Sequence, residues 1–181
     1  MFPIPQTEHR AEASDDLHQG RILLLLLWCR TAGAVDGIMK LAKLDFLLRY
    51  PVYFTRLLAK TRKCPPTVPA EAFERDTVES SMIRFRYGPW DPRYRRWIGL
   101  LTARHLVDAR LEGRTVKVVL THEGEATAIR LSQAPSFQVF SHRAQVLGDT
   151  LAKVNGTKLK NLIYEHVPEV TGTDWGEEIP V

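Results

Sequence analysis

Apolar residues recur at the three- and four-residue spacing of an α-helix in several parts of the chain. The run ILLLLLWC lies in the first of these parts, Pro51 suits the first position of the third, and Thr121 is a candidate N-cap for a later one. Helices are predicted over residues 16–32, 37–48, 51–62, 92–106, 121–133, 136–154 and 157–167.

Alternating and β-branched patterns predict a small amount of β-structure. The segment MIRFRY, residues 82–87, alternates apolar and basic side chains and is predicted to be a strand. Two β-rich runs flank Glu112-Gly113, which predicts a hairpin over residues 107–120. Helices, a strand, a helix, a hairpin and a closing helix follow one another in the order of a winged helix, with the hairpin as the wing. The predicted fold class is mostly α with a small β-sheet (α+β): a winged helix with additional N- and C-terminal helices.

The length of 181 residues suits one domain with extensions, and 44% hydrophobic residues are enough for a core. Residues 1–15 carry two prolines and then charges, and are predicted to form an extended arm. The winged-helix domain is assigned to residues 16–167, in which 63–80 is a proline-rich and then acidic connecting segment. Residues 168–181 are predicted to be a loose acidic tail.

Candidate catalytic and metal-binding residues do not form a recognisable site. None of the six histidines has metal-ligand spacing, and His122-Glu123 begins like HExxH but Ala126 stands at the partner position. His105 falls on an apolar helix face and is interpreted as a core residue. We therefore expect a protein that is not an enzyme, with no cofactor and no metal. An enzyme whose active site has no recognisable sequence pattern is kept as an alternative.

The apolar run of residues 22–29 is far shorter than the roughly 20 residues that a membrane-spanning helix needs. The two cysteines, Cys29 and Cys64, are too few for a disulfide framework and fit a reducing compartment. We expect a cytoplasmic protein without membrane contact.

Basic residues suggest a surface for nucleic acid. The net charge is +4. Residues 84–96 contain five arginines but only one aspartate, and aromatic residues are interleaved with the arginines. Candidate contacts to a DNA backbone are Arg84, Arg86, Arg93, Arg95 and Arg96, with Arg114 and Lys117 in the wing. The same composition is typical of a protein interface and of an ordinary solvated surface, so all three interpretations stay open.

Several large apolar side chains fall outside the predicted core stripes and are candidate contacts to a protein partner. They are Phe2, Ile4, Tyr53, Trp90, Trp175 and Ile179. Trp97, in contrast, falls on the inward face of its helix. Burying one such side chain contributes about 1.5–3 kcal/mol, so two or three of them can dominate an interface.

Two segments resemble known proteins. LTHEGEATAIRL, residues 120–131, resembles the passage of the form LTxEGxxxA that follows the wing in many winged-helix proteins. The leucine-rich first helix followed by KLAKLDFLLRYP resembles the middle component of the bacterial ABC-three-component defence systems, which include Lamassu. The resemblance is recognisable in the amino-acid sequence over residues 17–58 and in the order of the predicted elements over residues 17–167.

The resemblance implies a non-catalytic subunit encoded between an effector and an SMC-like ATPase, which it bridges. The resemblance assigns no catalytic or binding residue to this chain. The segment LDFLLRYP is too apolar for reading bases, so any DNA contact is expected to be non-specific and to reach phosphates. The alternative is a stand-alone winged-helix transcriptional regulator or antitoxin, which usually needs a dimer to bind paired half-sites.

Overall fold

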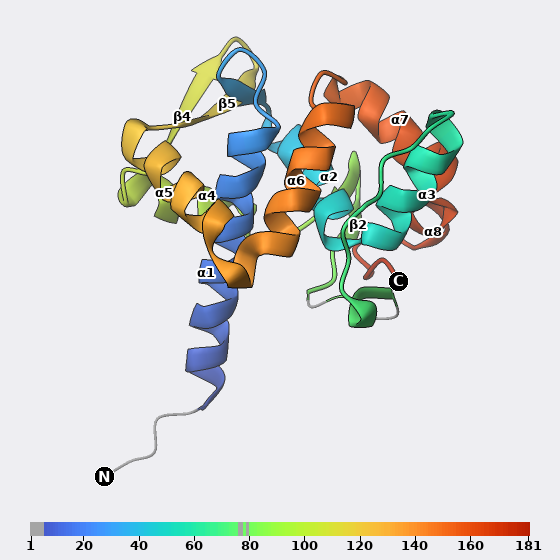
Figure 1. The fold of residues 1–181 in the computed structure, drawn as a ribbon, viewed down its shortest axis with the longest axis horizontal. Coiled ribbons are helices and arrows are strands. Elements are labelled where there is room, and N and C mark those ends of the chain that lie inside the picture. Colours follow the sequence, from blue (N-terminus) through green and yellow to red (C-terminus); the bar gives the residue numbers. More distant parts are fainter. Residues whose placement is uncertain (1–5, 76–77, 79) are drawn as a thin grey trace.

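The computed structural model describes residues 6–75, 78 and 80–181 of the chain, which are mostly helical with small antiparallel sheets (Figure 1). The α-helices are α1 Gln6–Trp28, α2 Ile38–Arg49, α3 Pro51–Thr61, α4 Tyr94–Ala103, α5 His122–Gln133, α6 Gln138–Leu151, α7 Gly156–His166 and α8 Pro168–Gly172. Short 3-10 helices are η1 Ala72–Arg75 and η2 Pro135–Phe137. The strands are β1 Ala34–Asp36, β2 Ile83–Phe85, β3 Gly88–Trp90, β4 Val107–Glu112 and β5 Thr115–Leu120.

The hairpin predicted over residues 107–120 is confirmed as β4 and β5, which pair antiparallel from Val107↔Leu120 onward. Gly113 takes a φ of 61° in the connecting turn, a conformation that suits glycine. The strand β1 was not predicted, because three residues are too few to show alternation. It pairs with β5 and gives the sheet order β1-β5-β4.

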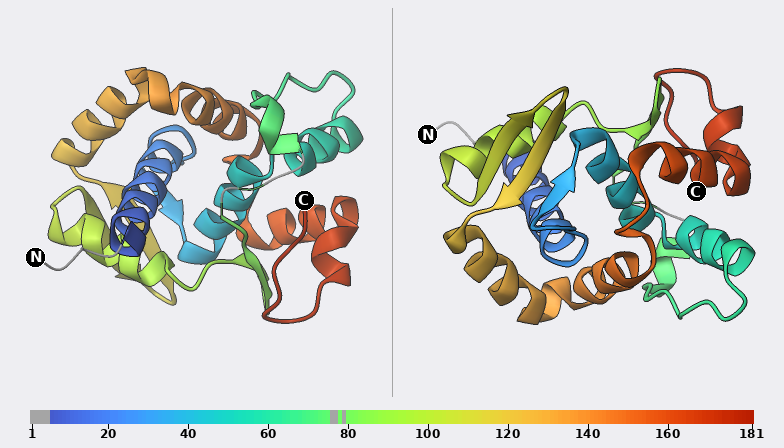
Figure 2. Two further views of the ribbon diagram at one scale, coloured as in Figure 1. Left: turned by 90° about the horizontal axis from the view of Figure 1, so that it is seen from below. Right: turned by 90° about the horizontal axis from the view of Figure 1, so that it is seen from above.

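Two helices form the centre of the described structure. α1 packs against α4, α5 and α6, and α2 is buried at every residue from Lys40 to Arg49 (Figures 1 and 2). Trp97 is fully buried, as its place on the inward face of α4 predicted. The extended arm predicted over residues 1–15 is wrong from Gln6 onward, since α1 begins there; its glutamine, glutamates and alanines are good helix formers and no proline interrupts them.

The C-terminal segment is fixed to the body of the protein, so the prediction of a loose tail is wrong. Gly176 N donates to Arg84 O at 2.8 Å, and Ile179 N donates to Met82 O at 2.8 Å, which places this segment beside β2 (Figure 1). The phenol of Tyr50 donates to Ile179 O at 3.1 Å, and that of Tyr53 donates to Pro180 O at 2.6 Å. The C-terminal segment is therefore part of the core, packed against Tyr50 and Tyr53 at the start of α3.

We expect Tyr50→Phe to lower the free energy of unfolding by about 1–3 kcal/mol. The Tyr50 hydroxyl donates to Ile179 O and accepts from the buried Met82 N at 3.0 Å, so its removal leaves both backbone groups without this partner. Urea unfolding measures the change. Tyr87→Phe is the matched control, because Tyr87 is exposed; an equal loss in both variants would contradict the tail contact.

Two further sequence predictions need correction near α4. His105 is exposed rather than in the core, because α4 ends at Ala103 and His105 takes a φ of 56° in the following turn. Gly88-Pro89 does not simply end the strand but begins β3, which returns along β2 with Arg84 opposite Pro89. The acceptor for Arg93 N is the Asp91 side chain, at 3.0 Å, before the helix begins at Tyr94.

Candidate functional site

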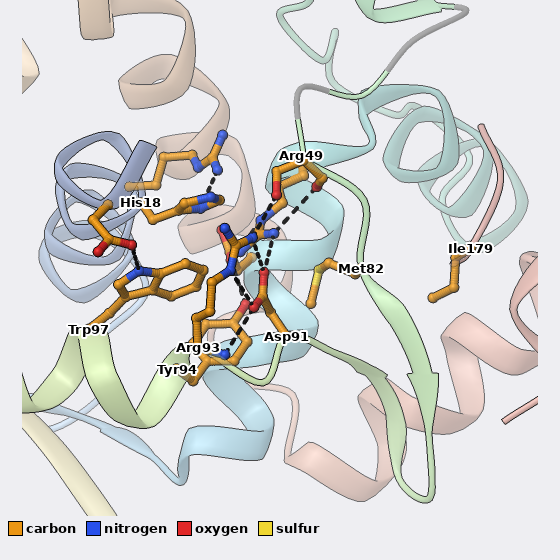
Figure 3. A network of polar contacts seen from close by, with 12 residues as sticks. His18, Arg49, Met82, Asp91, Arg93, Tyr94, Trp97 and Ile179 are labelled. Carbon is orange, nitrogen blue, oxygen red and sulfur yellow. Dashed lines mark hydrogen bonds and ion pairs between the residues drawn. The ribbon is translucent and has the colours of Figure 1, made fainter. Parts of the chain in front are cut away.

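A buried cluster of charged residues joins α2 to the start of α4 (Figure 3). Arg49 donates through Nε and Nη2 to Asp45 Oδ2, at 2.9 and 2.6 Å, and through Nη1 to Asp91 Oδ2 at 3.0 Å. The side chains of Arg49 and Asp91 are only 1% and 2% exposed. The spacing of four residues places Asp45 and Arg49 on one face of α2, so the pair forms within the helix.

The junction before α4 supplies the other half of this cluster. Arg93 donates to both carboxylate oxygens of Asp91 and, through Nη2, to Ser80 Oγ at 2.7 Å. The Tyr94 hydroxyl donates to Asp45, so the first turn of α4 is tied directly to α2.

The electrostatics of this cluster fix its charges. Burial, the largest effect, would raise the pKa of Asp91, but Arg93 and Arg49 outweigh it and lower the pKa to about 2. Burial lowers the pKa of Arg49, but Asp45, Tyr94 and Asp91 together raise it above its ordinary value. Burial, and then the charge of Asp45, raises the pKa of Tyr94. None of these groups changes charge near neutral pH, so the cluster holds α2 and α4 together and offers no general acid or base.

His18 on α1 packs against the same region. Its ring stacks on Trp97 with the centroids 4.1 Å apart, and Trp97 Nε1 donates to Asp15 Oδ1 at 2.8 Å (Figure 3). Burial, followed by the charges of Arg21, Arg49 and Arg93, lowers the pKa of His18 to about 2. His18 is therefore neutral at physiological pH.

Three of the five arginines between residues 84 and 96, all predicted to contact DNA, are engaged within the chain. Arg84 donates to the backbone carbonyls of Thr171, at 2.7 Å, and Thr173. Arg93 pairs with Asp91 in the cluster just described, and Arg96 Nη2 lies 2.8 Å from Asp15 Oδ2.

The remaining predicted contacts lie on different parts of the surface. Arg86 lies over the ring of Tyr87 at 5.5 Å, and Arg95 is exposed on α4. In the β4–β5 hairpin, Arg114 is exposed, whereas Lys117 Nζ lies 2.7 Å from Glu112 and 3.9 Å from Asp36. Within the part of the chain that the structure describes, Arg86, Arg95 and Arg114 have no ion pair.

The residues predicted to contact a partner fall into three groups. Phe2 and Ile4 lie outside the described residues. Tyr53 and Ile179 are each 1% exposed, so the expectation that they lie outside the core is wrong: the two segments bury each other. Trp90 is half-buried against Tyr94, and Trp175 is 65% exposed.

Exposed aromatic side chains gather on the β2–β3 hairpin and on the tail beside it. Phe85 and Tyr87 are 44% and 49% exposed, and Phe85 lies 6.2 Å from the ring of Trp90. Trp175 precedes Gly176, which is hydrogen-bonded to β2. We refer to Phe85, Tyr87, Trp90 and Trp175 as the aromatic hairpin surface. It contains three of the four aromatic side chains that are exposed among the described residues, and the fourth is Phe73.

Among the described residues, no three His, Cys, Asp or Glu side chains gather as metal ligands. None of the described helices combines the length and the apolar character that crossing a membrane requires. Cys29 is buried and Cys64 exposed, and both are free thiols.

Comparisons with known proteins leave the chain without an assigned family. No protein-family model matches it, and no curated protein or solved structure is significantly similar to it. The geometry of the surface therefore carries the functional argument.

Sequence reasoning missed the buried charges of α2. Lys40 and Lys43 lie beside apolar residues in the sequence, but both are buried, and Lys40 Nζ donates to Ala152 O at 2.6 Å. The spacing of Asp45 and Arg49 was the one available signal of a buried pair. The acceptor for Lys40 is 112 residues away in the chain, which no local pattern reveals.

Proposed function

We propose that this chain is a non-catalytic winged-helix accessory subunit that bridges an SMC-like ABC ATPase and an effector in a bacterial complex that defends against phages or plasmids. One observation carries the choice of a protein partner over DNA. Three of the five arginines between residues 84 and 96 are engaged within the chain, while aromatic side chains of the same stretch face solvent. The proposed complex lies in the cytoplasm, where the thiols of Cys29 and Cys64 stay reduced.

The order of the elements supports the winged-helix assignment. α1, β1 and α2 are followed, after an insertion that contains α3 and the β2–β3 hairpin, by α4, β4 and β5. The sheet order β1-β5-β4 is the one that a winged helix requires if β4 and β5 form the wing. In this assignment α4 takes the position of the recognition helix.

The surroundings of α4 argue against reading of DNA bases. A recognition helix presents arginine, asparagine or glutamine side chains to base edges. Here Arg96 pairs with Asp15, and Arg104 Nη1 lies 3.2 Å from Asp16 Oδ1, so acidic residues of α1 flank this helix. Their negative charge repels phosphates at the same place.

The aromatic hairpin surface has the composition of a protein interface. Interface residues that contribute most to binding are enriched in tryptophan, tyrosine and arginine, and Arg86 lies over Tyr87 within this surface. Its backbone is held by β2–β3 pairing and by the tail, so little ordering is needed on binding.

Co-expression with the products of neighbouring genes tests the proposal. We expect Phe85→Ser combined with Trp175→Ser to weaken binding to the ATPase or effector by at least about a hundredfold, because two large side chains lose their contacts. Biolayer interferometry measures the affinity. Leu111→Ser is the matched control, since Leu111 is 73% exposed and belongs to β4, outside the aromatic hairpin surface. Unchanged affinity in the double variant would exclude this surface as the contact.

A second candidate is the stand-alone regulator or antitoxin. The observation that favours it is the exposure of Arg95 on α4 and Arg114 in the wing, neither of which has an ion pair among the described residues. These are positions from which a winged helix reaches phosphates.

We expect the isolated chain to bind DNA weakly and without sequence preference. If Arg86, Arg95 and Arg114 each contact one phosphate, the slope of log K against log salt is about −2.7, so a fourfold rise in salt weakens binding by about 40-fold. Fluorescence anisotropy measures this slope. Arg95→Gln should reduce its magnitude by about 1, whereas Arg93→Gln should leave it unchanged. Tight binding to one palindromic site would favour the regulator instead.

A further inference from the structure

A hollow of about 600 Å³ opens at the base of the wing. The first residues of α2 and of α7, the wing turn and the β2–β3 turn form its wall. The view from above in Figure 2 shows α2 between the wing and α7, and residues from the starts of α2 and α7 line the hollow. Its volume falls within the range of small-molecule sites, roughly 300–1,000 Å³.

The wall of the hollow is strongly cationic. Lys40, Lys43, Arg114 and Lys160 line it, together with a single carboxylate, Asp36. Asp36 Oδ1 lies 3.9 Å from Lys117 outside the hollow. Within the described chain, none of the four lining cations has an ion pair.

Lys43 is the most unusual of these residues because it is only 3% exposed. Its ammonium donates to one backbone carbonyl of its own helix, Met39 O, at 3.0 Å, and has no carboxylate partner in the part of the chain that the structure describes. Burial, and then the charge of Lys160, lowers the pKa of Lys43 to about 8. A buried ammonium normally has a counter-ion, so an anion in the hollow would relieve an unfavourable arrangement.

The backbone adds to the positive potential. α2 begins after Gly37, whose φ of 98° suits glycine and which provides no side chain to cap the helix. α7 begins with Gly156 after its cap Asn155, and both residues line the hollow. Free amides and helix dipoles at such starts favour negative charge.

We propose that this hollow binds the phosphate groups of a nucleotide-sized ligand. Lys43, Arg114, Lys160 and the two helix starts suit phosphate oxygens, whereas the ammonium of Lys40 already donates to Ala152 O. The half-exposed ring of Tyr87 in the wall offers a face on which a base can stack. The common chemistry is a phosphate ester, supplied either by a free nucleotide or by the end of a DNA strand. This inference does not rest on the proposed bridging function.

Calorimetric titration of the purified full chain tests the site with three probes: pyrophosphate, ADP, and a short single-stranded oligonucleotide with a 5′-phosphate. We expect binding of pyrophosphate and of at least one of the other two. Arg114→Gln combined with Lys160→Gln should weaken it by at least about tenfold, through loss of charge-assisted contacts. Arg110→Gln combined with Lys153→Gln is the matched control, since both residues are exposed and lie outside the hollow.

Amide NMR spectra locate the site without relying on affinity. The signals of Gly37 and Gly156 should shift on addition of pyrophosphate in the unmodified chain and in the control variant, and circular dichroism should confirm that every variant is folded. Tighter binding of ADP identifies a nucleotide as the source of the phosphate, and tighter binding of the oligonucleotide identifies DNA. Absence of binding by all three probes, or equal binding by both double variants, would overturn the proposal.

Discussion

Replacing Arg49 with methionine should lower the free energy of unfolding by about 3–5 kcal/mol. Methionine fills a similar volume but carries no charge, so the buried carboxylate of Asp45 would lose its cation, and Asp91 would keep only Arg93. For a chain of this length, such a loss lowers the melting temperature by about 6–20 °C. Urea and thermal unfolding measure both quantities.

Arg56→Met is the matched control for this experiment. Arg56 also forms an ion pair, 2.7 Å from Glu169, but its side chain is 38% exposed and water can replace its partner. We expect a loss below about 1 kcal/mol. Adding Asp45→Asn to Arg49→Met should restore part of the stability, because the buried carboxylate that lost its cation is then removed, while Asp91 keeps its pairing with Arg93. Similar losses for Arg49→Met and Arg56→Met would contradict the buried cluster.

The stability of the folded chain should fall below pH 6.5 because of His18. The pKa of His18 is about 2 in the folded protein, compared with 6.5 in the unfolded chain. Between pH 6.5 and pH 2 the unfolded chain therefore binds a proton that the folded chain does not. Stability therefore falls with falling pH, by about 1.4 kcal/mol per pH unit, and the loss reaches about 2–3 kcal/mol at pH 4.5.

Unfolding free energies measured between pH 7 and 4.5 test this dependence. His18→Gln should flatten the pH dependence whatever its effect on absolute stability, because glutamine does not titrate. His122→Gln, at an exposed position, should keep the original slope. The carboxyl of Asp91 does not interfere, since its contribution is lost only below about pH 3.8. Equal slopes for the original chain and His18→Gln would contradict the buried neutral histidine.

Local patterns predicted the elements whose signals are local. The spacing of apolar residues gave α2 and α3 to within two residues, and Thr121 caps α5 by accepting from Gly124 N at 2.9 Å. The turn at Gly113 was visible for the same reason. These features depend on residues that lie close together in the sequence.

Features that depend on distant contacts could not be predicted. Ile179 is buried because its backbone pairs with that of Met82, almost a hundred residues earlier in the chain. Arg49 and Arg56 stand in similar sequence surroundings, but Arg49 has a buried partner 42 residues away, Asp91, whereas Arg56 pairs with Glu169 at the surface. The candidate surface was predicted in part: Trp175 is exposed as expected, whereas the acidic partner of Arg96, Asp15, becomes visible only in three dimensions.

The mass of the co-expressed complex, measured by light scattering after size-exclusion chromatography, tests the central proposal most directly. The chain should elute as a ternary complex with the two proposed partners, an SMC-like ATPase and an effector. Because the aromatic hairpin surface is mainly apolar, the complex should persist in about 0.5 M salt, where exposed ion pairs are screened. Elution of the chain alone, at low salt and with every neighbouring gene product present, would contradict the bridging function.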